Sequence, residues 1–280
     1  MLTKEDEARL LISRMRSLPT LPSVMGKVME VLKNNRSSAS DLVEVIRFDQ
    51  SLSLKILGLS NSAIYGFPRR ITSVSEAVVI LGFDLVKVLA LSLPVFEMAH
   101  GNPALSDFLK RLWAHSYKTA LLSGALSEDL GVQAKDSAFL GGLLADMGRA
   151  AFAHIDPAGY AEVVGNSGDG GTMMSLERER MGVDHPTASG WIADDFLLPE
   201  DVVYVMKYHH NPLECPEGKD TAMVVYLADF LLSMEGHDTA ADGYAVPDHD
   251  KMLKHFGLEG RDLQAYKETV LQKMFLTAAA

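Results

Sequence analysis

The stretch GLLADMGRA, residues 142–150, places a carboxylate in the middle of an apolar segment. At helical spacing Phe139, Leu143, Asp146 and Ala150 share one face, so the carboxylate of Asp146 should point toward the core. A buried carboxylate is costly unless a cation, a hydrogen-bond partner or a raised pKa relieves it. The stretch therefore predicts a helical core with a polar site inside it.

Helical periodicity extends over most of the chain, and an alternating strand pattern is almost absent, so we expect an all-α fold. Helices are predicted at about 22–33, 42–48, 51–60, 73–81, 106–130, 136–152, 186–196, 200–210 and 220–234. The pattern stops near 101–103 and again over 235–250. We expect an N-terminal helical lobe over 1–104, a second helical lobe over 105–235, and a loop with a C-terminal helical tail over 236–280. The tail should dock on the body of the chain, with a partner protein as the alternative.

Composition limits the class of protein. The chain has 280 residues, enough for one large domain or two smaller ones. Its formal net charge is -11 and no basic patch stands out, which argues against nucleic acid as a partner. Cys215 is the single cysteine, so no intramolecular disulfide can form, and this fits a reducing compartment.

Neither a secretion signal nor a membrane span is evident. The N-terminal sequence MLTKEDEARLLISRMRS is charged and lacks an uninterrupted apolar segment. The most apolar run, residues 85–96, is broken by Lys87 and Pro94 and is shorter than the ~20 residues that cross a bilayer. We expect a cytoplasmic protein that does not insert into membranes.

Several other polar side chains interrupt apolar helix faces. His115 lies on the face that carries Phe108, Leu112, Thr119, Leu122 and Leu126, and His209 shares a face with Val202, Val205 and Met206. Asp229 sits in the apolar segment MVVYLADFLL, and His185 directly precedes the helix-starting Pro186. With Asp146, the inward residues His115, His209 and Asp229 lie on four predicted helices and suggest one shared site, for which His185 is a fifth candidate. Imidazole and carboxylate ligands together suit Zn²⁺, Fe or Mn²⁺.

Each of these residues also has an ordinary structural interpretation. His115 could be a hydrogen-bonded core residue, and Asp146 could brace a neighbouring helix end. His209 and His210 precede Asn211-Pro212, where a histidine can satisfy the last carbonyls of a helix. The metal hypothesis depends on the whole set rather than on any single member.

The order His115, Asp146, His185, His209-His210 and Asp229 resembles the HD superfamily of metal-dependent phosphohydrolases, whose hallmark is a His-Asp doublet. GLLADMG is similar to the GLLHDIG of that family, with Ala145 in place of the doublet histidine. LPTLPSVMGKVMEVL (18–32), FDQSLSLKILGLSNSAIYG (48–66), ITSVSEAVVILG (71–82), LWAHSYKTA (112–120), LERERMGVDHPTASGWIADDFLLP (176–199) and YHHNP (208–212) resemble the HDOD domain, a regulatory branch of the superfamily. The resemblance covers about residues 15–235, and Phe196 departs from it where the family often has Trp.

The resemblance implies two packed helical lobes, the second an HD-like bundle, and a non-catalytic role in bacterial signal transduction through a protein partner or a nucleotide-type small ligand. It makes His115, Asp146 and Asp229 the vestigial candidates for a divalent metal (Fe, Mn or Zn), with His185, His209 and His210 as further pocket candidates and no catalytic residue assigned. Two alternatives stay open. One is a metal-dependent phosphohydrolase acting on nucleotides or cyclic dinucleotides, since three protein ligands can support catalytic zinc. The other is a scaffold whose inward His and Asp only hydrogen-bond one another.

Overall fold

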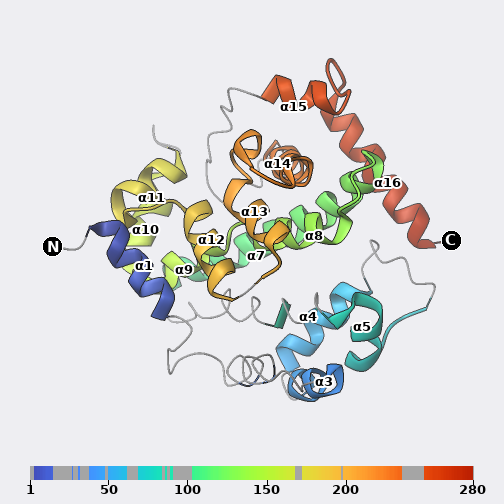
Figure 1. The fold of residues 1–280 in the computed structure, drawn as a ribbon, viewed down its shortest axis with the longest axis horizontal. Helices are drawn as coiled ribbons and strands as arrows, with labels where there is room; N and C mark the ends of the chain where they lie inside the picture. The colour runs from blue at the N-terminus through green and yellow to red at the C-terminus, as the bar shows by residue number, and fades with distance from the viewer. Residues whose placement is uncertain are drawn as a thin grey trace. The chain divides into compact units, whose positions relative to one another are not determined.

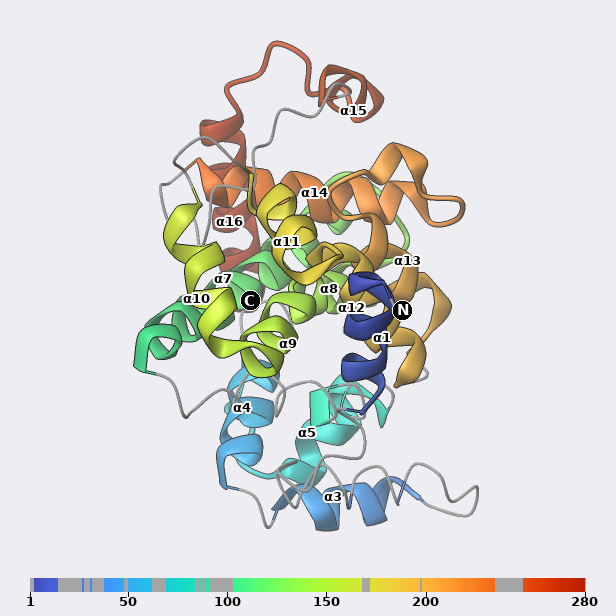
Figure 2. The ribbon, with the colours of Figure 1, turned by 90° about the vertical axis from the view of Figure 1, so that its left-hand side faces the viewer.

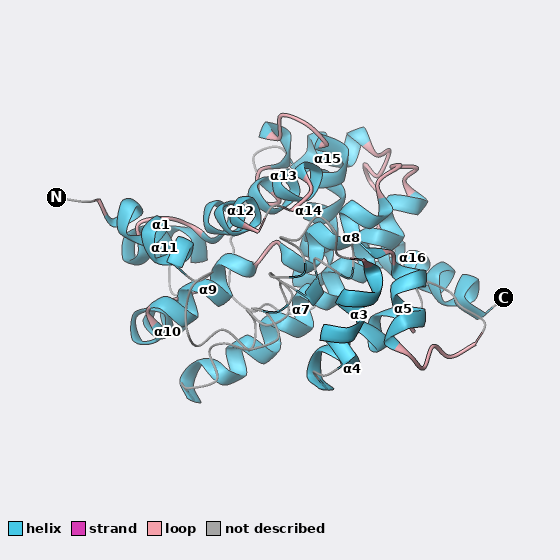
Figure 3. Cartoon of the chain, turned by 60° about the horizontal axis from the view of Figure 1, so that its bottom comes forward, coloured by secondary structure: helices cyan, strands magenta, loops and turns pink. Residues whose placement is uncertain are grey.

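The computed structural model describes residues 3–14, 27, 31, 38–47, 50–61, 69–83, 86, 89–90, 103–167, 172–196, 198–234 and 249–279. Within these ranges it contains helices and no strand, as the sequence predicts (Figure 3). The helices divide between two compact units, one of Met1–Arg14 with Ala99–Leu271 and one of Met15–Met98 with Gln272–Ala280. We call them the larger and the smaller unit. The helix expected over 22–33 and most of the loop expected over 235–250 lie outside the described residues.

The smaller unit contains α3 (Ala39–Arg47), α4 (Gln50–Ser60) and α5 (Val74–Leu81), which pack against one another in pairs. Leu42, Ile46 and Ile56 are fully buried there, because the apolar residues of α3 and α4 recur at helical spacing. The side-chain amide of Asn61 donates to the carbonyls of Leu57 and Ile71 at 2.7 and 2.8 Å. It thereby joins the end of α4 to the segment before α5.

The larger unit holds the remaining helices (Figure 1). They are α1 (Lys4–Arg14), α7 (Pro103–Asp129), α8 (Lys135–Leu144), α9 (Met147–Ile155), α10 (Pro157–Asn166), α11 (Met173–Met181), α12 (His185–Asp195), α13 (Glu200–Tyr208), the short 3₁₀ helix η2 (Pro212–Glu214), α14 (Lys219–Ser233), α15 (His249–His255) and α16 (Leu263–Ala279), whose last residues belong to the smaller unit. The long helix α7 packs against α8 and α14, and α12 packs against α9 and α13. α13 also packs against α8 and α14, so the helices that carry or flank the predicted polar residues share one core.

The first helix lies in the larger unit, whereas the expected division placed residues 1–104 in one lobe. α1 packs against α12, beside which it lies in Figure 2. Ala8 and Ile12 of α1 are buried. Arg9 pairs with Asp195 at 3.3 Å, and Lys4 donates to the carbonyl of Glu179 at 2.9 Å. The apolar stripe of α1 and these two polar contacts explain its place.

The helix expected over 136–152 is two helices, α8 and α9, separated at Ala145 and Asp146, so the prediction of one continuous helix is wrong. The backbone of Asp146 leaves the helical region, with φ −92° and ψ 12°. A hydroxyl from α12 supports the break, because Ser189 Oγ donates to the carbonyl of Ala145 at 2.6 Å and accepts from the amide of Gly148 at 2.8 Å. These bonds satisfy buried backbone groups where the regular helix stops.

The C-terminal tail docks on the larger unit, as expected. Met252 of α15 packs with Met223 and Tyr226 of α14 in a buried cluster. Tyr266 of α16 donates from its hydroxyl to Asp129 Oδ2 at 2.8 Å at the end of α7. Within the described ranges, no helix combines the length and the apolar character that crossing a bilayer requires.

Candidate metal centre

The break between α8 and α9 sets the position of Asp146 at the start of α9. Gly148 lies so close to the start of α12 that a Cβ atom there would come 2.3 Å from the carbonyl oxygen of His185. Only glycine permits this approach. The spacing of Asp146 and Gly148 in GLLADMGRA thus brings the carboxylate beside the first residue of α12.

His115 of α7 and Asp229 of α14 form a buried pair. The Nε2 atom of His115 is 2.6 Å from Asp229 Oδ1, and the hydroxyl of Thr119 lies 3.4 Å from the same nitrogen. Burial alone would lower the pKa of His115, but the hydrogen bond and charge of Asp229 outweigh it and raise this pKa to about 9. The pKa of Asp229 is lowered, since the histidine outweighs its burial. The pair is therefore an imidazolium against a carboxylate.

Asp146 faces a different cation, the guanidinium of Arg149. Arg149 Nε lies 3.1 Å from Asp146 Oδ1, and Arg149 Nη2 lies 3.4 Å from His185 Nε2. The arginine side chain is only 1% exposed. Burial would raise the pKa of Asp146, but Arg149 and then His185 hold it well below its usual range. The carboxylate is charged, and its charge is balanced inside the core.

His185 is oriented by a buried carboxylate of α11. Glu177 Oε2 accepts from the backbone N–H of His185 at 2.8 Å and from its Nδ1 at 2.7 Å, while Tyr160 donates to Glu177 Oε1 at 2.9 Å. Because a carboxylate accepts, Nδ1 of His185 carries a proton. Its Nε2 is thus turned toward Asp146 Oδ1, 3.4 Å away, and toward His210 Nε2, 3.1 Å away.

The two histidines after α13 complete a cluster with His185. One nitrogen from each of His185, His209 and His210 lies within 4.8 Å of the other two. His209 Nδ1 donates to the carbonyl of Met206 at 2.9 Å, and its Nε2 is buried without a hydrogen-bond partner among the described residues. Burial, then the nearby His185, lowers the pKa of His209 to about 4, and burial lowers that of His210 well below its usual value. These two imidazoles are neutral and have the protonation state of metal ligands.

The structure thus divides the six predicted residues into two groups. His185, His209 and His210 gather at a spacing that fits a metal ion, and the unpartnered Nε2 of His209 supports this. His115, Asp146 and Asp229 are all buried as predicted, but they do not form such a group within the described residues. Ala145 offers no ligand atom, Asp146 pairs with Arg149, and His115 pairs with Asp229. Among the described residues, the three histidines rather than the vestigial doublet therefore have the spacing of a metal site.

Two residues of the site were missed by sequence reasoning, Arg149 and Glu177. Charged residues are usually exposed, so both would be placed at the surface by composition alone. A signal was present for each. Arg149 follows Asp146 by three residues, a spacing that lets helical side chains meet, and Glu177 lies midway between Met173 and Met181 at intervals of four residues. Arg149, Glu177 and the two methionines are all at most 8% exposed.

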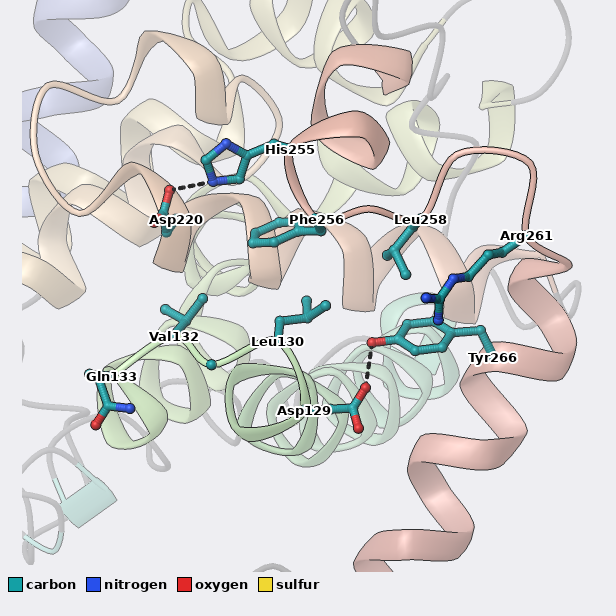
Figure 4. Close-up of a pocket in the computed structure, with 11 residues that line it drawn as sticks. Asp129, Leu130, Val132, Gln133, Asp220, His255, Phe256, Leu258, Arg261 and Tyr266 are labelled. Atoms are coloured by element: carbon teal, nitrogen blue, oxygen red, sulfur yellow. Dashed lines mark hydrogen bonds and ion pairs between the residues drawn. The ribbon is translucent and has the colours of Figure 1, made fainter.

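A cavity of about 440 Å³ lies apart from this cluster, between the end of α7, the start of α14 and the segment joining α15 to α16 (Figure 4). His255 pairs with Asp220 at 3.0 Å on one side of it. Tyr266, with Asp129 below it and Arg261 beside it, lies on the other side. None of the six predicted residues lines this cavity. It marks where the C-terminal tail docks.

Comparison with known proteins decides the family. The family model of the HDOD domain matches residues 18–212, more than half of the chain. The chain belongs to the HDOD domain family. The match includes the doublet position at Ala145 and the paired histidines, and it ends at Pro212.

Solved structures share the fold. An HDOD domain protein of unknown function from Geobacter sulfurreducens is 22% identical with a TM-score of 0.62, and the alignment covers 98% of this chain and 93% of that one. A candidate phosphohydrolase from Shewanella amazonensis SB2B is 21% identical with a TM-score of 0.64, and the alignment covers 96% of this chain and 98% of that one.

Among sequence relatives, an uncharacterized protein from Treponema pallidum (strain Nichols) is 27% identical over 213 residues, which are 75% of this chain and 41% of that relative's length. This HDOD chain therefore spans about two fifths of the Treponema relative.

Proposed function

We propose that this HDOD domain protein is a non-catalytic signal-transduction module that acts by binding a protein partner or a small ligand. The observation that carries the proposal is the state of the doublet. Ala145 supplies no imidazole, and the remaining Asp146 is held by the permanent charge of Arg149 at 3.1 Å. An HD-type hydrolase would need this carboxylate as a metal ligand beside an open coordination position.

The ligand class expected for the module is a nucleotide-type molecule, and its partner is expected to be a signalling protein of a bacterial cytoplasm. Both expectations come from the HDOD family and from the absence of any evident basic patch for nucleic acid in a chain of net charge -11. Acting through contacts with another molecule fits a core in which the buried charges are already paired.

A second candidate function is metal-dependent hydrolysis of a phosphodiester, and one observation favours it. The nitrogens of His185, His209 and His210 could hold Zn²⁺ or Fe, and the buried Nε2 of His209 has no other described partner. Such an ion, when bound, would polarise a phosphoryl oxygen or a water molecule. Glu177 would fix the ring of His185, as it does in the structure.

Ligand and metal binding together separate the two functions. Purified protein is assayed for bound metal, for thermal stabilisation by a panel of mononucleotides and cyclic dinucleotides, and for hydrolysis of the same compounds. The proposal predicts stabilisation by at least one nucleotide without its turnover, both in the wild type and in His115→Ala. Turnover that depends on added metal and disappears in His209→Ala and His210→Ala, which lack ligands of the three-histidine cluster, would support the hydrolase instead.

A further inference from the structure

We propose that Arg149 is the resident cation of the buried site and that its guanidinium excludes a divalent metal from the doublet position at Asp146. The inference deepens the proposed function and rests on it, since it explains how an HD-like core dispenses with its metal.

Two ligand atoms at this position have the spacing of neighbouring metal ligands. Asp146 Oδ1 and His185 Nε2 are 3.4 Å apart. Two ligands of a tetrahedral ion, each ~2.1 Å from the metal, are separated by about the same distance. Asp146 and His185 could therefore bind one ion with almost no movement.

Arg149 contacts the same two atoms. Its Nε is 3.1 Å from Asp146 Oδ1, and its Nη2 is 3.4 Å from His185 Nε2. An ion bound to this carboxylate oxygen at ~2.1 Å would therefore lie no farther than about 5 Å from the guanidinium Nε. A dication and a guanidinium at that separation repel strongly in a core that excludes water.

The repulsion cannot be relieved by proton loss or by simple withdrawal of the side chain. Arginine keeps its proton in proteins, unlike histidine or lysine. Its side chain is 1% exposed, so withdrawal would require the surrounding core to open. Arg149 lies three residues after Asp146, on the first turn of α9, and this spacing holds its guanidinium beside the carboxylate. Arg149 thus supplies the positive charge that a buried carboxylate requires and that a metal would otherwise provide.

The test measures Mn²⁺ affinity of the full chain after chelation, by calorimetric titration with metal content checked by mass spectrometry. Arg149→Gln is expected to bind Mn²⁺ at least tenfold more tightly than the wild type, and Asp146→Asn/Arg149→Gln is expected to lose that gain. Arg180→Gln removes an arginine whose side chain is 46% exposed and pairs with Asp156 outside the site, so it should leave the affinity unchanged. An affinity of Arg149→Gln within threefold of the wild type, or a gain that persists without Asp146, would overturn the inference.

Arg149→Lys keeps the inference testable if Arg149→Gln does not fold. The lysine retains a positive charge near Asp146, so its Mn²⁺ affinity is expected within threefold of the wild type. A tenfold gain in Arg149→Lys that is equal at pH 6 and pH 8, and so does not depend on loss of the lysine proton, would show that the charge does not exclude the metal. These outcomes are distinct from failure of the proposed function, because that function is refuted by turnover in the wild type, whereas the present inference is refuted by metal affinities alone.

Discussion

Glu177 gives the sharpest test of how the site is built, because it is a fully buried carboxylate with three hydrogen-bond donors around it. Glu177→Ala leaves the backbone N–H and Nδ1 of His185 and the hydroxyl of Tyr160 without this acceptor. A buried polar group that loses its partner costs ~1–3 kcal/mol, so the expected loss in free energy of unfolding is at least ~3 kcal/mol. Glu177→Gln keeps the shape and a carbonyl acceptor and should cost ~1–3 kcal/mol.

Urea unfolding followed by tryptophan fluorescence measures this loss, because both tryptophans, Trp113 and Trp191, lie in the larger unit. The matched control is Glu179→Gln, an exposed position on the same helix, which should change the free energy by less than ~0.5 kcal/mol. A loss below 1 kcal/mol in Glu177→Ala would refute the role of this carboxylate in orienting His185.

Three further predictions use the same unfolding assay. Ser189→Ala removes the hydroxyl that bridges α12 to the break before α9. The loss of two buried hydrogen bonds should lower the free energy of unfolding by ~2–4 kcal/mol. A loss under 1 kcal/mol would show that the break persists without this hydroxyl. Tyr266→Phe removes the hydrogen bond to Asp129 and should cost ~1–2 kcal/mol of the free energy of unfolding. Hydrogen exchange should become faster in α15 and α16 but not in α8. Unchanged exchange in α15 and α16 would count against a docked tail. The third prediction concerns protein treated with a chelator, in which folding raises the pKa of His115 from 6.5 to about 9. The protonated histidine therefore stabilises the fold fully below pH 6.5, and this contribution is lost as the pH rises through 9. The free energy of unfolding should fall by up to roughly 3 kcal/mol over this range. His115→Gln should abolish this decline, and an equal decline in both proteins would exclude His115 as its source.

The sequence predicted the helical class and the inward faces well, because helical spacing directly reports which side chains share a face. His115, Asp146, His185, His209 and Asp229 are all at most 7% exposed. The spacing carries no information about partners from other helices. It therefore could not reveal that Asp229 lies against His115.

The break between α8 and α9 shows the same limit in the backbone. The sequence from Leu143 to Ala150 predicts one continuous helix, because every residue in it except Gly148 has an ordinary helix propensity. The hydroxyl of Ser189, more than forty residues away in the chain, satisfies the carbonyl where the helix stops. A tertiary contact of this kind overrides local propensity and leaves no local trace in the sequence.

Hydrolysis by the wild type distinguishes a non-catalytic module from a phosphodiesterase. The protein is incubated with cyclic dinucleotides and with a generic phosphodiester in the presence of Mn²⁺, Fe²⁺ or Zn²⁺, beside Ala145→His, which restores the doublet histidine. We expect no turnover above the Asp146→Ala background in either protein, because Arg149 pairs with Asp146 in the wild type and the substitution at 145 leaves both residues in place. Metal-dependent turnover by the wild type that is absent from Asp146→Ala would contradict a non-catalytic module.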